Sequence, residues 1–173
     1  MRLMKGSDMK KLVSVVVILL IAVVAFAAAP QRAAAPEFSL RDLQGRTHTL
    51  SKMKGKVVVI DFGRVICIPC RKVMDDLNLL HKAYAGKGVN IYSVNLGVDS
   101  ETVKRHIADK KLTFPFLQDP DMKVTQSYGV QSIPYLVVID KNGRISNTHI
   151  GYPGGFKDMI ESEIKTLLAE KAK

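Results

Sequence analysis

The chain has 173 residues and a formal net charge of +10 at pH 7. This length suits one domain with a hydrophobic core, because domains of about 100 to 150 residues are the most common. The basic residues are dispersed, Trp is absent and only 6% of the residues are aromatic, which argues against a nucleic-acid surface of basic and stacking side chains. We therefore expect no nucleic-acid partner. The basic surface is either simply solvated or faces an acidic partner or an anionic membrane.

The N-terminal residues differ from the rest of the chain. Lys10 and Lys11 precede the apolar run LVSVVVILLIAVVAFAAA, in which Ser14 is the only polar side chain. The run is intermediate in length between a signal-peptide core and a spanning helix of about 20 residues. Ala25-Phe26-Ala27 also fits an A-x-A cleavage site. Because basic residues before such a run stay inside, the chain after it is expected to be exported.

These features give the expected domain organisation. Residues 1–29 are predicted to be a signal peptide or signal anchor, and residues 30–36 an Ala/Pro linker. Residues 37–173 form the expected domain. We expect this domain on the extracytoplasmic (periplasmic) face of the membrane, tethered by the N-terminal helix or released after cleavage.

The domain is expected to open with a hairpin, whose strands are residues 38–41 and 47–50. Residues 57–62 come next and are apolar on both alternating faces apart from Asp61. That pattern is typical of a central strand covered on both sides.

A βαβ unit follows from the next patterns. Apolar residues at three- and four-residue spacing predict a helix that starts near Cys67 and ends before Gly86. Residues 89–96 read as a strand, and Asp99 caps a helix that runs to about Lys111. In an open sheet with parallel strands, the functional site usually lies at the carboxyl ends of the strands. The two cysteines come shortly after residues 57–62 and are therefore expected at that edge.

The last third of the chain predicts a short helix, a hairpin and a terminal helix. The short helix ends at Tyr128-Gly129, and residues 135–140 and 144–150 read as antiparallel strands joined through an Asn-Gly turn. The terminal helix carries an apolar stripe that is expected to pack on the sheet: Phe156, Met159, Ile160, Ile164, Leu167 and Leu168.

Cys67 and Cys70 are the only two cysteines of the chain, and three interpretations compete for them. A structural disulfide across so short a loop stabilises by only about 2 kcal/mol, against about 4 for a long loop. A zinc site needs four ligands, and the chain's histidines are isolated, so no metal site is expected. We assign no role to any of the four: His48, His81, His106 and His149.

The third interpretation, a reactive dithiol, explains the spacing itself. A helix starting at Cys67 directs its unpaired N–H groups and its dipole at that sulfur and favours the thiolate, which makes Cys67 the nucleophile. Cys70 lies one turn further in, close enough to resolve a mixed disulfide and shielded from outside reagents. Pro69 fits the first turn of a helix without the loss of a needed donor.

Several motifs together resemble the thioredoxin superfamily, and most closely its exported TlpA/ResA-like branch. They are the cysteine motif DFGRVICIPC after an apolar strand, the later segment GVQSIPYLVVID and the turn NGR. The similarity extends over about residues 36–170. It implies a thioredoxin-like α/β fold: a central mixed sheet flanked by helices, with an N-terminal hairpin and an extra βα insertion.

The resemblance also implies an activity and partners. The expected enzyme is a thiol-disulfide oxidoreductase that exchanges disulfides with protein substrates through Cys67 and Cys70, with no cofactor besides that redox-active disulfide. Branch members often reduce disulfides in apocytochrome c or in proteins of copper-centre assembly. They are expected to receive electrons from a membrane thiol donor.

Two further site residues follow from the resemblance. Asp61 matches the buried aspartate of thioredoxins, and a carboxylate in so apolar a strand suggests a task, such as accepting the proton of Cys70. An Asp that simply caps the following turn is the alternative. Pro134 matches the family's cis-proline, whose loop offers backbone groups of Ile133 to a substrate strand; an ordinary trans proline is the alternative.

The chain also departs from the family pattern. Ile66 replaces the Trp expected before the first cysteine, and Val73 replaces a Glu that many branch members carry. Ile66 and Ile68 are expected to border the substrate site and to disfavour the Cys67 thiolate by desolvation, whereas the neighbouring basic side chains favour it. The sequence does not determine whether the thiolate of Cys67 is favoured or disfavoured overall.

A Cu(I) chaperone using the same two thiolates is the main alternative function. Copper chaperones of this superfamily usually have CxxxC and a later His ligand, so the spacing here disfavours that reading. A peroxidase of the related peroxiredoxin group would need a Thr before its cysteine in a P-x-x-x-T-x-x-C pattern, which DFGRVIC lacks.

Overall fold

A computed structural model describes residues 32–172. The leader expected at residues 1–29 and the first two residues of the expected linker lie outside this range. Within residues 32–172, no helix combines the length and hydrophobicity needed to cross a membrane.

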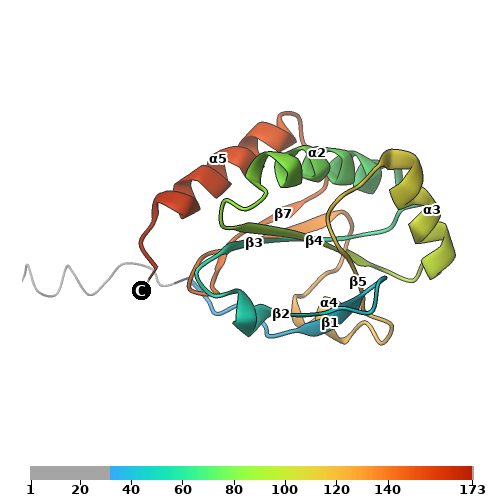
Figure 1. Ribbon diagram of the computed structural model, residues 1–173, viewed down its shortest axis with the longest axis horizontal. Helices are drawn as coiled ribbons and strands as arrows, with labels where there is room; N and C mark the ends of the chain where they lie inside the picture. The colour runs from blue at the N-terminus through green and yellow to red at the C-terminus, as the bar shows by residue number, and fades with distance from the viewer. Residues whose placement is uncertain (1–31, 173) are drawn as a thin grey trace, which may run out of the picture. The chain divides into compact units, whose positions relative to one another are not determined.

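The centre of the fold is a seven-stranded mixed sheet with the order β2-β1-β5-β4-β3-β6-β7 (Figure 1). Strand β3 is parallel to β4, and β4 to β5, whereas the other pairs are antiparallel. The N-terminal hairpin and the central place of β3 confirm the sequence prediction. The strands are β1 (Ser39–Asp42), β2 (Thr47–Thr49), β3 (Val57–Gly63), β4 (Val89–Asn95), β5 (Phe116–Gln118), β6 (Tyr135–Ile139) and β7 (Ile145–Ile150).

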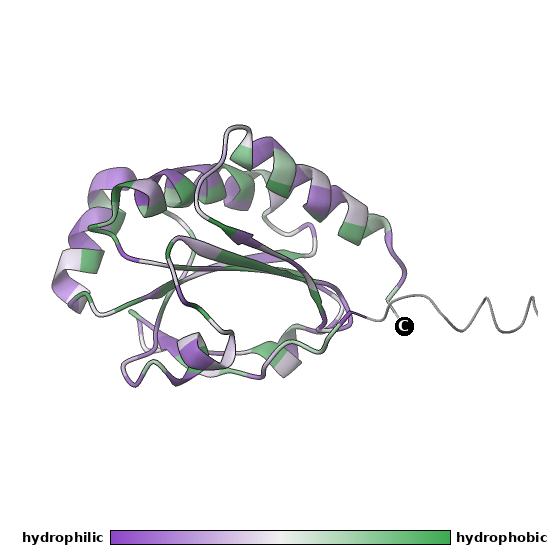
Figure 2. Ribbon diagram, turned by 180° about the vertical axis from the view of Figure 1, so that it is seen from behind, coloured by the Kyte–Doolittle hydropathy of each residue, from purple (hydrophilic) through white to green (hydrophobic). Residues whose placement is uncertain are grey.

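Helices cover both faces of the sheet. In Figure 1, α2 and α5 run across the top of the sheet with α3 beside them, while α4 lies below. Figure 2 shows hydrophobic and hydrophilic residues alternating along these helices, as expected for elements with one buried face. The helices are the 3-10 helix η1 (Leu50–Met53) and the α-helices α2 (Ile68–Tyr84), α3 (Ser100–Lys110), α4 (Lys123–Ser127) and α5 (Phe156–Ala169).

Strand β3 contributes to two separate cores because its side chains alternate between the faces of the sheet. Val57 and Val59 belong to the cluster formed with α2 and α5. Val58, Ile60 and Phe62 belong to the cluster on the opposite face. By the same alternation, Asp61 points to the α2 side of the sheet.

Four residues of the apolar stripe of α5 are buried, Leu168 is partly buried and Met159 is exposed. Phe156, Ile160, Ile164 and Leu167 are at most 1% exposed, but Met159 is 38% exposed, so its expected burial was wrong. Met159 lies near the edge strand β7, where it lines a groove beside His149. The sequence pattern marks an apolar face but does not show how far the sheet extends under it.

Residues 32–36, expected as a linker, lie along the domain. Ala34 forms a β-bridge with Arg144, and the Ile145 N–H donates to the Ala33 carbonyl over 2.9 Å. Arg32 pairs with Asp140 at 3.1 Å. These contacts extend the folded domain to Arg32, because backbone groups that pair with a sheet edge are part of the sheet's hydrogen bonding.

The first hairpin is held by a buried carboxylate. Asp42 accepts hydrogen bonds from the Gln44 N–H, from the Arg46 backbone and Nε, and makes a 2.9 Å contact with His48 Nε2. Burial raises the pKa of Asp42, but the hydrogen bonds from His48, Arg46 and Gln44 outweigh it and lower the pKa to about 2.

Candidate active site

The two cysteines sit at the start of α2, beyond the carboxyl end of β3. Cys67 is the N-cap residue, and its sulfur accepts a hydrogen bond from the Cys70 N–H over 3.3 Å. The two sulfurs form a disulfide, so the structure represents the oxidised state. Cys70 is fully buried, whereas Cys67 is partly exposed, and Pro69 occupies the first turn. An outside thiol or disulfide can therefore reach Cys67 and not Cys70.

The Ile133–Pro134 peptide bond is cis, as the resemblance implies. Phe62 of β3 pairs with Tyr135 of β6, so the loop before Tyr135 lies at the end of β3 from which the chain runs to Cys67. The Pro134 carbonyl accepts the Gly151 N–H over 2.9 Å, which ties this loop to the end of β7. The role of Ile133 in binding a substrate strand stays a prediction.

Asp61 is 0% exposed and lies directly beneath the start of α2. Its Oδ2 accepts the Ser93 hydroxyl over 3.1 Å. Its Oδ1 has no hydrogen-bond partner in the described part of the chain. Burial raises the pKa of Asp61 to about 7, although the Ser93 hydrogen bond opposes the rise. A carboxyl that titrates near neutral pH can accept and release a proton under ordinary conditions, as an acid–base group must.

The side chains of Asp61 and Cys70 approach each other across Gly63. A Cβ placed on Gly63 would lie 3.3 Å from Asp61 Oδ2, 3.6 Å from Asp61 Oδ1 and 3.3 Å from the Cys70 Cβ. Both carboxylate oxygens therefore lie close to Cys70 across Gly63, with Oδ2, which accepts the Ser93 hydroxyl, slightly nearer to Gly63. This proximity agrees with the predicted proton transfer between Asp61 and Cys70, although the role itself stays a prediction.

Exposed apolar and basic residues lie near Cys67 in the sequence. Ile66 and Ile68 are 63% and 65% exposed, and Arg64 and Lys72 are exposed as well. Exposed isoleucines remove little water from Cys67, so the desolvation expected from them is small. Val73, which stands where many branch members have Glu, is fully buried in the core and supplies no second carboxylate.

Sequence reasoning missed two residues of this site. Ser93 lies in the apolar strand β4, on the same buried face as Val89 and Ile91. A polar residue at such a position could have been noticed in the sequence. Gly63 gave no signal, because its importance depends on the atoms on either side of it. Ser93 could not be assigned to Asp61 without the register between β3 and β4, and the closeness of Gly63 to Cys70 depends on how α2 packs on β3.

Three of the four histidines take part in separate contacts, and the buried Nε2 of His106 has no hydrogen-bond partner among residues 32–172. His48 contacts Asp42, His81 contacts Thr113, and His149 contacts Glu163 at 2.9 Å. In residues 32–172, no group of three or more His, Cys, Asp or Glu side chains is placed to hold a metal ion.

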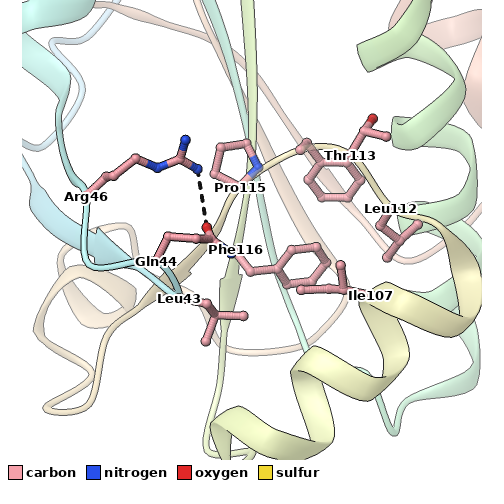
Figure 3. Close-up of a pocket in the computed structure, with 9 residues that line it drawn as sticks. Leu43, Gln44, Arg46, Ile107, Leu112, Thr113, Pro115 and Phe116 are labelled. Atoms are coloured by element: carbon pink, nitrogen blue, oxygen red, sulfur yellow. Dashed lines mark hydrogen bonds between the residues drawn. The ribbon is translucent and has the colours of Figure 1, made fainter.

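A small pocket lies apart from the cysteines, between the turn after β1 and the segment that joins α3 to β5. Figure 3 shows Leu43, Ile107 and Phe116 along it, with Arg46 donating to Gln44 over 3.2 Å at one side. None of the residues that line it belongs to the dithiol site.

Taken together, the fold and the dithiol at a helix start define a thiol-disulfide oxidoreductase of the thioredoxin-like class. The chain belongs to the AhpC/TSA family, whose sequence profile matches residues 32–148.

Curated relatives agree with this assignment. The thiol-disulfide oxidoreductase ResA of Geobacillus thermodenitrificans is 38% identical over 117 residues, which cover 68% of this chain and 67% of the relative. ResA of Halalkalibacterium halodurans is 31% identical over 136 residues, which cover 79% of this chain and 76% of the relative.

Solved structures are similar as well. A Chlorobium tepidum protein described as a thiol:disulfide interchange protein DsbE is 29% identical, with a TM-score of 0.74 over 82% of this chain and 100% of the other. A Neisseria meningitidis protein described as a thioredoxin is 31% identical, with a TM-score of 0.73 over 83% of this chain and 95% of the other. The predicted thioredoxin-like fold and the ResA-like resemblance are therefore confirmed.

Proposed function

We propose that this oxidoreductase works on the extracytoplasmic face of the membrane as a reductant of protein disulfides in cytochrome c or copper-centre maturation. The likeness to proteins named thiol-disulfide oxidoreductase ResA supports the exchange of disulfides. The apolar N-terminal run of the sequence supports export. A membrane thiol donor would then return the disulfide to the dithiol.

The observation that carries the proposal is the unequal exposure of the two cysteines. The Cys67 thiolate attacks a substrate disulfide, forms a mixed disulfide and releases one substrate thiolate. The Cys70 thiol then loses its proton to Asp61, attacks the Cys67 sulfur and releases the second substrate thiolate. The substrate gains two electrons, and the chain ends with the Cys67–Cys70 disulfide seen in the structure.

The proposal is tested with a Cys70→Ser variant in cells. This change leaves the attack by Cys67 intact and removes the group that releases the product, so mixed disulfides with physiological substrates should accumulate. Non-reducing gels of the exported fraction, followed by mass spectrometry, identify the trapped chains. A Cys67→Ser variant is the matched control and should trap none of them.

The identity of the trapped chains decides between the alternatives. Apocytochrome c or a copper-site protein supports the proposed reductase. A broad set of newly exported cysteine proteins would favour a general oxidase or isomerase. If no chain is trapped and the wild-type dithiol binds one Cu(I) and passes it to a target, the protein is a Cu(I) chaperone and the proposal is wrong.

A further inference from the structure

The buried carboxylate of Asp61 lies in a row of residues that crosses the sheet on its α2 side. In the strand register, Asp61 lies beside Leu136 of β6 and beside Ser93 of β4, and Ser93 lies beside Phe116 of β5. Leu136 and Phe116 belong to the hydrophobic core. His149 of β7 continues the row beyond Leu136, but it is one strand further from Asp61 and its Nε2 contacts Glu163. Ser93 is therefore the neighbour of Asp61 in this row that hydrogen-bonds to its carboxylate.

The groups that face Asp61 from other elements are few. From α2 the titratable group is Cys70, whose Cβ approaches the carboxylate across Gly63. The buried residues that α5 contributes to this core are apolar. Burial and the Ser93 hydrogen bond are the causes of the shifted pKa of Asp61, with no contribution from a neighbouring charge. Among residues 32–172, Ser93 is thus the single hydrogen-bond partner of this buried carboxyl.

We propose that Ser93 is a positioning residue for thiol-disulfide exchange: its hydroxyl holds Asp61 Oδ2 on the β4 side and leaves the unpartnered Oδ1 free to accept the proton of Cys70 past Gly63. The inference rests on the proposed role of Asp61 as the proton acceptor. It adds a residue that makes no contact with substrate and acts through the carboxylate alone.

The proposal predicts the direction of a pH effect. The Ser93 hydroxyl donates to the charged carboxylate, so it favours ionisation. In a Ser93→Ala variant, the pKa of Asp61 rises further, and less carboxylate is present near neutral pH to accept a proton. Hydrogen bonds to charged groups are strong enough for a shift of about one to two pH units.

The proton-transfer step can be isolated with the reduced full-length protein and the aromatic disulfide DTNB in a stopped-flow instrument. Cys67 attacks DTNB and releases one thionitrobenzoate anion. Cys70 then loses its proton, attacks the Cys67 sulfur and releases the second anion as the intramolecular disulfide forms. The rate of the second release is measured between pH 5 and 10, a range that extends about two units below and about three units above an Asp61 pKa of about 7.

In the wild type, we expect the second rate to rise through the pKa of Asp61. In Ser93→Ala the rise should move about one to two pH units to higher pH. The rate at pH 7 should fall about tenfold, and the two proteins should converge where Cys70 ionises unaided. Ser93→Thr keeps the hydroxyl and should restore the wild-type profile.

A matched control comes from the other face of the sheet. Thr125 of α4 is buried and its hydroxyl donates to the buried Asp119 over 2.7 Å, so Thr125→Val removes the same kind of hydrogen bond on the face of the sheet opposite α2 (Figure 1). It should leave the pH profile of the second release unchanged. The first release, by Cys67, should be the same in all these proteins.

The outcomes separate this inference from the proposed function. Asp61→Asn should abolish the rise near pH 7. If it does so and Ser93→Ala leaves the profile in place, Ser93 has no positioning role and the inference is wrong. If Asp61→Asn itself leaves the profile unchanged, the carboxylate is not the proton acceptor and both fail. A loss in Ser93→Ala that is equal at every pH would indicate damaged packing and would also overturn the inference.

Discussion

Replacing Asp61 by Asn should make the stability of the protein depend less on pH. Asp61 is fully buried, with one hydrogen bond to its carboxylate. Burial raises its pKa from 3.8 to about 7 in the folded protein. Because the folded pKa lies above the unfolded one, folding favours the protonated carboxyl. The stability that protonation of Asp61 contributes is thus fully present below about pH 4 and is lost as the pH rises from about 4 to 7.

The size of the effect follows from the shift. A shift of about three pKa units corresponds to about 4 kcal/mol of stability lost by the wild type between pH 4 and pH 8. That is a large part of the 5–15 kcal/mol typical of a folded domain. Asparagine keeps the shape of the side chain and can still accept the Ser93 hydrogen bond. Its buried amide N–H₂ costs about 1 to 3 kcal/mol if unpaired, but equally at every pH.

The assay is urea unfolding of the oxidised wild type and the oxidised Asp61→Asn variant at pH 4, 6 and 8. In the oxidised proteins the cysteines do not titrate, and all other groups cancel in the difference between the two. We expect the free energy of unfolding of the variant, relative to the wild type, to increase by about 4 kcal/mol from pH 4 to pH 8. A change below about 1 kcal/mol would refute the reasoning that Asp61 is neutral in the fold at acidic pH.

Two further predictions use other parts of the structure. Asp42→Asn should have the opposite pH dependence, because hydrogen bonds lower the pKa of Asp42 to about 2. The variant should lose about 2 kcal/mol of the free energy of unfolding, measured with urea near pH 7, and this loss should shrink as the pH falls toward 2. A loss that stays constant with pH would point to lost packing. Mild alkylation of the reduced protein should modify Cys67 before Cys70, since Cys70 is fully buried; peptide mass spectrometry that found Cys70 modified first would reverse the assigned roles.

Most of the fold could be predicted from local patterns. The strand at residues 57–62, the helix that starts at Cys67 and the helix capped by Asp99 all occur within a residue or two of the expected positions. Each rests on periodicity and on capping residues, which act within one element. Met159 could not be predicted, because its exposure depends on where the edge of the sheet lies.

By itself, the sequence determined the chemistry of the site. Two cysteines separated by two residues at a helix start, and a lone carboxylate in an apolar strand, are local facts that need no packing to be recognised. Only the tertiary structure decided what surrounds them: the Ser93 hydrogen bond to Asp61, the narrow gap at Gly63, and the docking of residues 32–36 on the domain. These contacts join residues far apart in the chain, and they depend on strand register and packing, which no single segment encodes.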